Sequence, residues 1–476
     1  MWDTINKILN YVDDFVWGPP LMVLILAGGI YLTVRMGILQ IRKLPLALKW
    51  MVKNDEDTEG EGEVSSFGAL CTALSATIGT GNIVGVATAI GTGGPGALFW
   101  MEVAAFFGMA TKYAEGLLAV KYRVIDKEHH ALGGPFYYIE RGMGEKWKWL
   151  AKIFAFFGIC VGLFGIGTFS QVNGISSAVN DFFDPNMKWT VEIPGIGTYS
   201  WVVVIASLIL SICVALVLIG GIQRIANVSQ IVVPFMAIIY ILLCMFLLIC
   251  NYKAIPSAIV TIVTAAFQPK AITGGVVGTM VIAMQKGVAR GIFSNEAGLG
   301  SAPIAAAAAK TKEPVRQGLI SMTGTFIDTI VICTMTGIAI VLTNAWQVEG
   351  LEGVAVTTYA FNKGLPIPEV CSSFLLMLCL VFFAFTTILG WDYYSERCLE
   401  YLSGGKKKTV LVYRWLYIFA VFIGPYMTVK AVWTIADIFN GLMAIPNMIA
   451  IFALSPIIIK ETKSFFRHYR IEYSLK

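Results

Sequence analysis

The sequence predicts an all-α polytopic membrane protein. Of its 476 residues, 57% are hydrophobic and only 14% are charged, whereas soluble domains carry roughly 25% charged residues. Apolar runs long enough to cross a bilayer follow one another almost from end to end, with short polar stretches between them. Because so few charged residues could not solvate the surface of a soluble protein, the chain needs lipid around it.

The apolar runs predict about eleven transmembrane helices, since a helix needs roughly 20 apolar residues to cross the hydrocarbon core. Several of the runs are too long or too rich in glycine to form one straight helix. The predicted spans are residues 20–37, 66–91, 96–120, 153–178, 199–220, 226–250, 272–306, 318–344, 370–395, 409–424 and 431–459.

The N-terminus carries no recognisable cleavable signal peptide, because it lacks a basic region followed by an apolar core. Instead, apolar residues recur at helical spacing before Pro19 and Pro20, which predicts an amphipathic helix on the membrane surface. These residues are Trp2, Ile5, Leu9, Val12, Phe15 and Val16.

The lysines and arginines predict the orientation. Most of them fall after the odd-numbered spans, and cytoplasmic loops are the ones enriched in basic residues. We therefore expect the N-terminus outside and the C-terminus in the cytoplasm. The net charge of +5 is spread over many membrane flanks and does not indicate nucleic-acid binding. The opposite side holds only Lys7, Lys188, Lys253, Lys270, Lys363 and Lys430.

The second span is interrupted by polar and glycine residues. Gly79, Thr80 and Gly81 are followed by Asn82 at membrane depth. Such a segment can unwind at modest cost, and its freed amides and carbonyls then suit a carboxylate and a small cation. The alternative is close helix packing through small residues.

A second glycine-rich span contains Gly287, Arg290, Gly291 and Glu296. A shift of 210 positions superimposes three small residues of the two segments: Ala73 on Ala283, Gly81 on Gly291 and Ala87 on Ala297. The two spans run in opposite directions in the predicted topology. Two broken helices at matching places in inverted halves are typical of a transporter with a binding site at the midplane.

Further polar residues interrupt other spans. Arg290 and Glu296 lie six positions apart, so each is expected to pair with another helix. Lys112 and Glu115 are expected to pair locally. The polar groups without an assigned partner are Glu102, Lys286 and Asp328, and two further polar stretches are Ser170-Gln171-x-Asn173 and Thr386-Thr387.

These segments resemble the alanine/glycine:cation symporter family of prokaryotes over nearly the whole chain. Two departures from the family pattern are Glu102, where the signature continues Trp-Met-Trp, and Ala306, where many members have histidine. The matching stretches are residues 76–90, 93–101, 112–115, 121–123, 133–135, 287–291, 293–303 and 390–391.

The resemblance implies a leucine-transporter-like fold of two inverted five-helix repeats with one extra N-terminal helix. Residues 1–64 would hold the amphipathic helix, the extra span and a cytoplasmic linker. Residues 65–250 and 251–460 would form the two repeats, and residues 461–476 a cytoplasmic tail. It also implies that the protein lies in the prokaryotic cell (inner) membrane and functions as a monomer.

The resemblance further implies the binding residues. The substrate carboxylate would meet the amides of Thr80 and Gly81, and the amine the Thr77 carbonyl and Gln171. Trp391 would limit substrate size. The remaining pocket residues would be Gly79, Asn82, Met284, Gln285, Gly287 and Thr387, and the sodium ligands would be Ser75, Ile78, Phe383, Thr386 and Thr387, with Asn82 at a possible second ion site.

We expect a secondary transporter that imports alanine or glycine with sodium by alternating access, with no enzymatic activity and no cofactor. A proton-coupled symporter and an amino-acid exchanger on the same fold are the alternatives. An ion channel and an intramembrane enzyme are further rivals. The channel would use Lys286 and Arg290 on an anion path, and the enzyme lacks an evident nucleophile, base or metal set.

Overall fold

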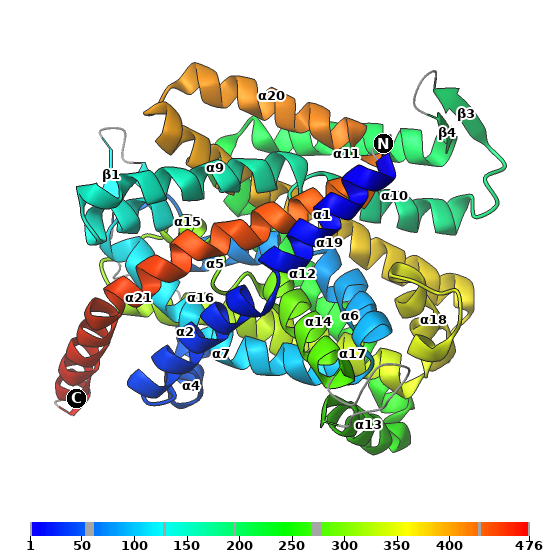
Figure 1. Ribbon diagram of the computed structural model, residues 1–476, viewed down its shortest axis with the longest axis horizontal. Helices are drawn as coiled ribbons and strands as arrows, with labels where there is room; N and C mark the ends of the chain where they lie inside the picture. Colours follow the sequence, from blue (N-terminus) through cyan, green and yellow to red (C-terminus); the bar gives the residue numbers. More distant parts are fainter. Residues whose placement is uncertain are drawn as a thin grey trace.

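The computed structural model describes residues 2–52, 61–126, 130–193, 197–267, 278–426 and 430–474. Nearly all of these residues are helical (Figure 1). Nine helices in the described ranges are long and apolar enough to cross a membrane, and the bent pair over residues 66–93 makes ten. The predicted polytopic helical architecture is therefore confirmed. The seventh predicted span, residues 272–306, is the one not found in this group: residues 268–277 lie outside the described ranges, and Lys286 and Arg290 interrupt the apolar sequence of the rest.

The chain begins with the predicted amphipathic helix α1 (Trp2–Val16), and α2 (Pro19–Arg35) starts at the two prolines. Proline is favoured there because the first turn of a helix needs no amide hydrogen. The α1 helix lies along the long C-terminal helix α21 (Figure 1). Helices α3 (Leu39–Arg42) and α4 (Leu44–Val52) complete this segment.

The next part of the chain contains five spans. The one predicted over residues 153–178 is divided, because α9 ends at Phe164 and α10 begins at Phe169. The elements are α5 (Ser66–Thr77), η1 (Gly81–Gly85), α6 (Val86–Gly93), α7 (Gly96–Lys121), β1 (Val124–Ile125), β2 (Ala131–Leu132), α8 (Pro135–Tyr137), η2 (Tyr138–Gly142), η3 (Glu145–Trp147), α9 (Lys148–Phe164), α10 (Phe169–Phe183), β3 (Thr190–Ile193), β4 (Gly197–Ser200), α11 (Trp201–Leu218) and α12 (Gly221–Cys250).

The last part ends in the longest helix of the described chain. Its elements are η4 (Tyr252–Ala254), α13 (Ile255–Phe267), α14 (Gly278–Asn295), α15 (Ala302–Ala306), α16 (Pro314–Thr325), η5 (Phe326–Cys333), α17 (Thr334–Leu342), η6 (Ala345–Gln347), α18 (Val354–Gly364), α19 (Glu369–Ser403), α20 (Lys407–Ile423), η7 (Gly424–Tyr426) and α21 (Lys430–Ser474).

The helices form a buried centre and an apolar exterior. The α7 helix packs against α16, α14, α2 and α13 and is largely buried. The outer helices α11 and α12 instead expose large apolar side chains such as Ile209 and Phe235. Since soluble proteins rarely expose extended apolar faces, these surfaces fit contact with lipid. Two antiparallel hairpins, β1–β2 and β3–β4, lie in the connections between helices.

The first break lies where the sequence predicted it. The α5 helix begins at a cap in which the Ser65 hydroxyl accepts a hydrogen bond from the Gly68 amide at 2.9 Å. It ends at Thr77, and the chain bends by 51° before the helix resumes at Gly81.

The second break does not lie at Gly287–Gly291, where the sequence analysis placed it. The α14 helix continues without interruption to Asn295. The break follows it, where Glu296, Gly298 and Gly300 have positive φ angles of 56°, 91° and 83°. The two glycines adopt this conformation without the steric cost that a side chain would add.

The earlier glycines of α14 have a packing role. A Cβ atom on Gly287 would lie 2.1 Å from the Ala97 carbonyl oxygen, and one on Gly291 would lie 3.1 Å from the Met101 Cγ atom. These glycines therefore allow α14 to approach α7 closely, which is the alternative that small residues in membrane helices always offer.

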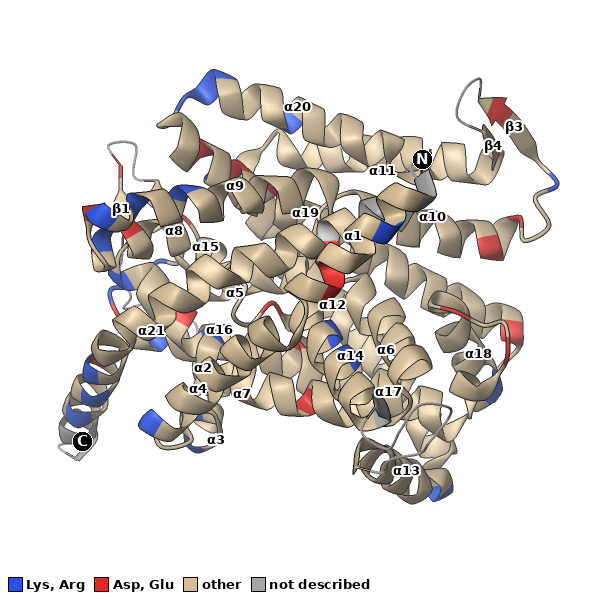
Figure 2. Cartoon of the chain, in the orientation of Figure 1, with Lys and Arg blue, Asp and Glu red and all other residues tan. Residues whose placement is uncertain are grey.

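Basic residues gather on one side of the molecule. Figure 2 shows lysines and arginines around β1, at the start of α20, on α3 and along the end of α21. The side that carries β3, β4 and α18 has few of them. The asymmetry expected from the sequence is thus also present in three dimensions.

Candidate functional site

The first break redirects two backbone amides away from the helix. The Gly79 amide donates to Asn82 Oδ1 at 2.9 Å, and the Thr80 amide donates to Gln171 Oε1 of α10 at 3.2 Å. In a continuing helix these amides would donate to the carbonyls of Ser75 and Ala76. The break therefore frees carbonyl oxygens at the end of α5.

Four of the predicted sodium ligands come together where α5 ends: Ile78, Phe383, Thr386 and Thr387. Thr387 Oγ1 lies 3.3 Å from the Ile78 carbonyl oxygen and donates to the Phe383 carbonyl at 3.0 Å. Thr386 Oγ1 also donates to Phe383, at 3.0 Å. All four residues and Ser75 are buried. Two helices thus present neutral oxygen atoms to one another in a water-poor place.

A carboxylate that the sequence analysis left without a role joins both breaks. Asp328, in the π-helical segment η5, accepts hydrogen bonds from Asn82 Nδ2 at 2.8 Å and from Ser294 Oγ at 2.9 Å. Thr329 Oγ1 donates to the same carboxylate at 2.7 Å. The sequence signal was an aspartate within an apolar span, since such residues mark functional sites.

The first break also packs closely against the last turn of α14. A Cβ atom on Gly81 would lie 3.4 Å from the Ser294 Cα atom. On the other side, a Cβ atom on Gly79 would lie 2.4 Å from Thr387 Oγ1. The backbone of the first break therefore sits between the end of α14 and the middle of α19, without room for larger side chains.

A large cavity reaches this region. It has a volume of about 720 Å³, lies between α6, α10 and α18, and is called the vestibule here. The buried Thr80 is among its lining residues. The vestibule therefore leads to the first break. Other residues that line it are Val84, Thr88, Asn173, Gly174, Asp181, Glu352 and Val356.

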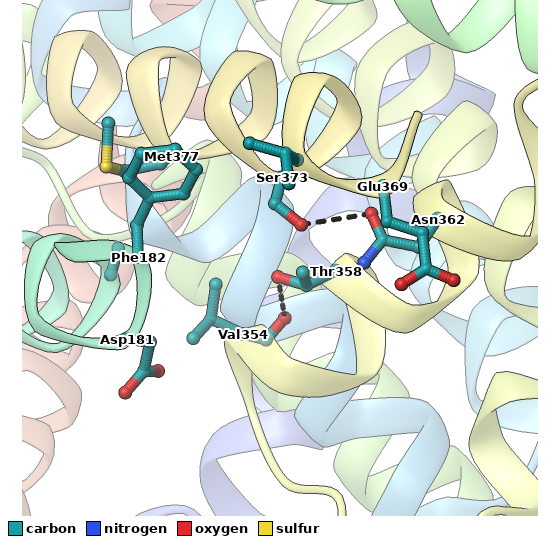
Figure 3. A pocket seen from close by; sticks show the side chains of 10 residues that line it. Asp181, Phe182, Val354, Thr358, Asn362, Glu369, Ser373 and Met377 are labelled. Carbon is teal, nitrogen blue, oxygen red and sulfur yellow. Dashed lines mark hydrogen bonds between the residues drawn. The ribbon is translucent and has the colours of Figure 1, made fainter. Parts of the chain in front are cut away.

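A side cavity of about 300 Å³ lies next to the vestibule, between α10, α18 and the start of α19 (Figure 3). Asp181 and Val354 line both cavities. In the side cavity, Ser373 Oγ donates to Asn362 Oδ1 at 3.0 Å, and Thr358 Oγ1 donates to the Val354 carbonyl at 3.1 Å. The first of these hydrogen bonds joins α19 to α18 at the rim of the vestibule, and the second lies within α18.

Three expected pocket residues on α14 lie elsewhere. Gly287 packs against Ala97, as described above, and Met284 is half-buried among apolar side chains. Gln285 lines a small separate cavity of about 50 Å³ together with Trp17 and Arg290. The reason is that α14 remains helical at this level, so its side chains face α7 and α1 instead of the first break.

Arg290 has the interhelical partner that was expected for it. Its Nη2 atom lies 3.5 Å from Asp437 Oδ2 of α21. Trp17 Nε1 donates to the Asp437 carbonyl at 2.9 Å, which ties the end of α1 to the same place. This arrangement pairs Arg290 with an acidic residue of α21.

Lys112 and Glu115 face the second break and not one another. Lys112 Nζ donates to the Asn295 carbonyl at 2.8 Å. Glu115 Oε1 accepts from the Gly298 amide at 3.1 Å and from Asn447 Nδ2 at 2.7 Å. The α7 helix thereby holds the unwound segment after α14 in place, because all of these groups are buried and depend on these bonds.

Trp391 is fully buried in α19. A Cβ atom on Gly167 would lie 2.7 Å from the Trp391 Cβ atom, and the Tyr394 ring packs edge-on at 5.5 Å. Glu296, for which an interhelical partner was expected, accepts a hydrogen bond from Ser301, five residues further along. Thr77, another expected site residue, is buried at the end of α5 and turns its hydroxyl back toward the carbonyls of its own helix.

Comparisons with known proteins agree with this architecture. The model of the sodium:alanine symporter family matches residues 2–474. The chain is 54% identical over 471 residues to an uncharacterized transporter of Haemophilus influenzae, with 99% of this chain and 98% of that protein covered. It is 46% identical to the sodium/alanine symporter AgcS of Methanococcus maripaludis, covering 96% and 97% of the two chains.

A solved structure shows the same fold. The crystal structure of MhsT in complex with L-phenylalanine matches with a TM-score of 0.56, covering 84% of this chain and 98% of that chain at 12% sequence identity. The expected leucine-transporter-like fold is thereby confirmed. Since a family model and close relatives span the whole chain, the protein is a transporter and not an enzyme, and it belongs to the sodium:alanine symporter family.

Proposed function

We propose that this protein imports small neutral amino acids, alanine and glycine, together with sodium by alternating access. The observation that carries the proposal is the position of the Thr387 hydroxyl against the Ile78 carbonyl that the first break has freed. The description of the 46% identical relative as a sodium/alanine symporter supports the same substrate and ion.

The first sodium ion would bind between α5 and α19. Its ligands would be the Ser75, Ile78 and Phe383 carbonyls with the Thr386 and Thr387 hydroxyls. Hard cations prefer oxygen ligands. A hydroxyl that donates its hydrogen to a carbonyl keeps its lone pairs, so the hydrogen bonds described above hold the ligands close together without blocking them.

A second cation site would use Asn82 with Asp328 and Ser294. The three side chains that donate hydrogen bonds to the Asp328 carboxylate are all neutral. A cation would displace one of these donors and balance the charge, which is costly to bury alone. Because Asn82 and Ser294 belong to different broken helices, such an ion would hold the two breaks together.

The amino acid would bind at the first break, reached through the vestibule. Its carboxylate would take the amides of Thr80 and Gly81, and Gln171 would leave the Thr80 amide and turn to the substrate. The Thr77 carbonyl would accept from the amine. Trp391 would limit the size of the substrate side chain.

Ion and substrate would bind cooperatively. Sodium between Ile78 and Thr387 would hold the first break in the geometry that the amino acid needs. A coupling free energy of about 2 kcal/mol corresponds to roughly thirtyfold tighter substrate binding. The converse also holds, because bound substrate must raise the sodium affinity by the same factor.

The membrane placement is part of the proposal. The basic side in Figure 2 would face the cytoplasm, with the N-terminus outside and the vestibule opening outward. Residues 65–250 and 251–460 would be the two inverted repeats that move against one another. The protein would work as a monomer in the prokaryotic inner membrane.

The test is alanine uptake into proteoliposomes of the purified protein. An imposed sodium gradient should drive accumulation, whereas a proton gradient without sodium should not. Accumulation driven by protons alone would make the protein a proton symporter. Exchange of internal for external alanine with no response to either gradient would make it an exchanger, and either result would overturn sodium symport.

A further inference from the structure

Asp392 is a buried carboxyl with no part in the proposed sodium or substrate sites. It lies in the middle of α19, directly after Trp391, and none of its surface is exposed. Among the residues that the structure describes, none donates a hydrogen bond to either of its carboxyl oxygens. A carboxylate buried without donors or a counter-ion is very unfavourable.

A second carboxyl lies one helical turn away from Asp392. Glu396 is four positions further along α19, so the two side chains lie on the same face of the helix, and both are buried. Two carboxylates offer only acceptors, so no hydrogen bond can form between them unless one carries a proton. The contact is therefore repulsive with both groups ionised and attractive with one proton between them.

Glu396 is the member of the pair that has a counter-ion. Arg414 of α20 donates to it through both Nε and Nη2, at 2.6 and 2.8 Å. This bidentate arrangement is the strongest that an arginine makes with a carboxylate. The positive charge of Arg414 is thus used by Glu396, and the negative charge of an ionised Asp392 would remain unbalanced.

The other charged and titratable groups that face Asp392 do not supply the missing charge. Arg397 on the same helix pairs with Glu400, at 2.7 Å. From α20, the Tyr417 hydroxyl lies 2.7 Å from the backbone carbonyl oxygens of Gly167 and Ile388, and Tyr413 is buried. The α9 helix presents Gly158 and Gly162 to this part of α19.

From this geometry we infer that Asp392 is a proton-binding site, which in this conformation holds one proton. With the proton in place, Asp392, Glu396 and Arg414 together are neutral. A metal cation is a poorer occupant, because Arg414 already lies on the same carboxylate and repels it. The inference does not depend on the sodium ligands, which lie further along α19 toward its N-terminus.

The proton has a route to water. A cavity of about 890 Å³ opens on the basic side of the molecule and is lined by Arg397, Glu400 and Arg414. Arg414 thus forms the wall between this cavity and the carboxyl pair. A shift of α20 away from α19 would admit water, and the proton would pass from the Asp392 carboxyl to that water, leaving a carboxylate that Glu396 repels.

The consequence is that proton release from Asp392 is linked to opening of the protein on the basic side, where this cavity lies. The closed state holds the proton and the open state loses it, so acid on the cavity side favours the closed state. A single proton can change the ratio of the two states by up to about tenfold for each pH unit. Alanine release into the vesicle interior should therefore slow as the internal pH falls.

Infrared difference spectroscopy tests for the proton without any transport. The spectrum of wild type minus Asp392→Asn should show the carbonyl stretch of a protonated carboxylic acid at neutral pH, shifted in D2O. Asparagine is nearly isosteric and uncharged, so this variant should fold. The control is Glu192→Gln on the exposed strand β3, whose difference spectrum should show carboxylate bands only. A wild-type minus Asp392→Asn spectrum without the protonated band would overturn the inference.

Uptake into vesicles at varied internal pH tests the link to opening. The wild type and Glu192→Gln should lose uptake as the interior is acidified. Asp392→Asn, which stays neutral, should keep sodium-dependent alanine binding but lose this pH dependence. An Asp392→Asn protein that keeps the wild-type pH profile would refute the link, and a failure of sodium coupling in all three proteins would bear on the proposed function alone.

Discussion

Removing the Thr387 hydroxyl tests the first sodium site most directly. In Thr387→Ala the Ile78 carbonyl loses the hydroxyl that lies 3.3 Å away, whereas the Phe383 carbonyl still accepts from Thr386. The cost to stability should thus be one neutral hydrogen bond, about 1 kcal/mol. The protein should fold, so that its ion binding can be measured.

The effect on sodium should be larger than the effect on stability. An interaction with a full charge contributes about 1.5–3 kcal/mol in proteins. Since each 1.4 kcal/mol is a factor of ten in affinity, the sodium concentration for half-maximal alanine uptake should rise roughly 10- to 100-fold. Thr387→Ser keeps the hydroxyl and should stay close to wild type, which makes it the matched control.

The assay is a sodium titration of alanine uptake, with a parallel titration of alanine binding to the purified protein. Both should shift by the same factor, because ion and substrate binding are linked. An Ala variant with the wild-type sodium titration would remove Thr387 from the ion site. A Ser variant as defective as the Ala variant would show that packing by the methyl group, and not the hydroxyl oxygen, is what matters.

Three further changes probe the rest of the site. Asp328→Asn should raise the sodium concentration needed for alanine binding by at least tenfold, because the single amide oxygen cannot accept hydrogen bonds from both Asn82 and Ser294. An unchanged sodium titration would exclude a second ion at Asp328. Gly390→Ala should destabilise the protein by about 1–3 kcal/mol, since the added Cβ atom would lie 2.7 Å from the Ala76 Cβ atom. Gly85→Ala is the control, because a Cβ atom there would have no neighbour within 4 Å. Equal melting temperatures for the two variants would contradict the packing argument. Trp391→Ala should admit larger amino acids in competition assays, and an unchanged substrate range would remove Trp391 as the size limit.

The sequence was sufficient to locate the first helix break and insufficient to locate the second. At Gly79–Asn82 the local residues are enough to end the helix, because the Gly79 amide donates its hydrogen bond to the Asn82 side chain, only three positions away. At the second span, the glycines of α14 looked equivalent, yet helix α7 packs on them and keeps that segment helical. Glycine permits both unwinding and close packing, and only the neighbouring helix decides between them.

The same contrast separates the expected ligands from the unexpected one. Thr386 and Thr387 could be proposed in advance because the family resemblance implies sodium ligands at these positions. Asp328 was visible as a polar residue without a partner, but its role depends on Asn82 and Ser294, which approach from helices distant in the sequence. Contacts across such separations are set by how the helices cross, and residue spacing along one helix carries no information about it.

By itself, the sequence determined that this is a helical membrane protein, where most of its spans lie, and where the first helix unwinds. These are local properties, because hydropathy, charge bias and glycine content act within one segment. The tertiary structure alone decided which groups meet: Thr387 with Ile78, Asp328 with Asn82 and Ser294, and Glu396 with Arg414. The physical reason is that a buried polar group must find its partner wherever the packed helices place one.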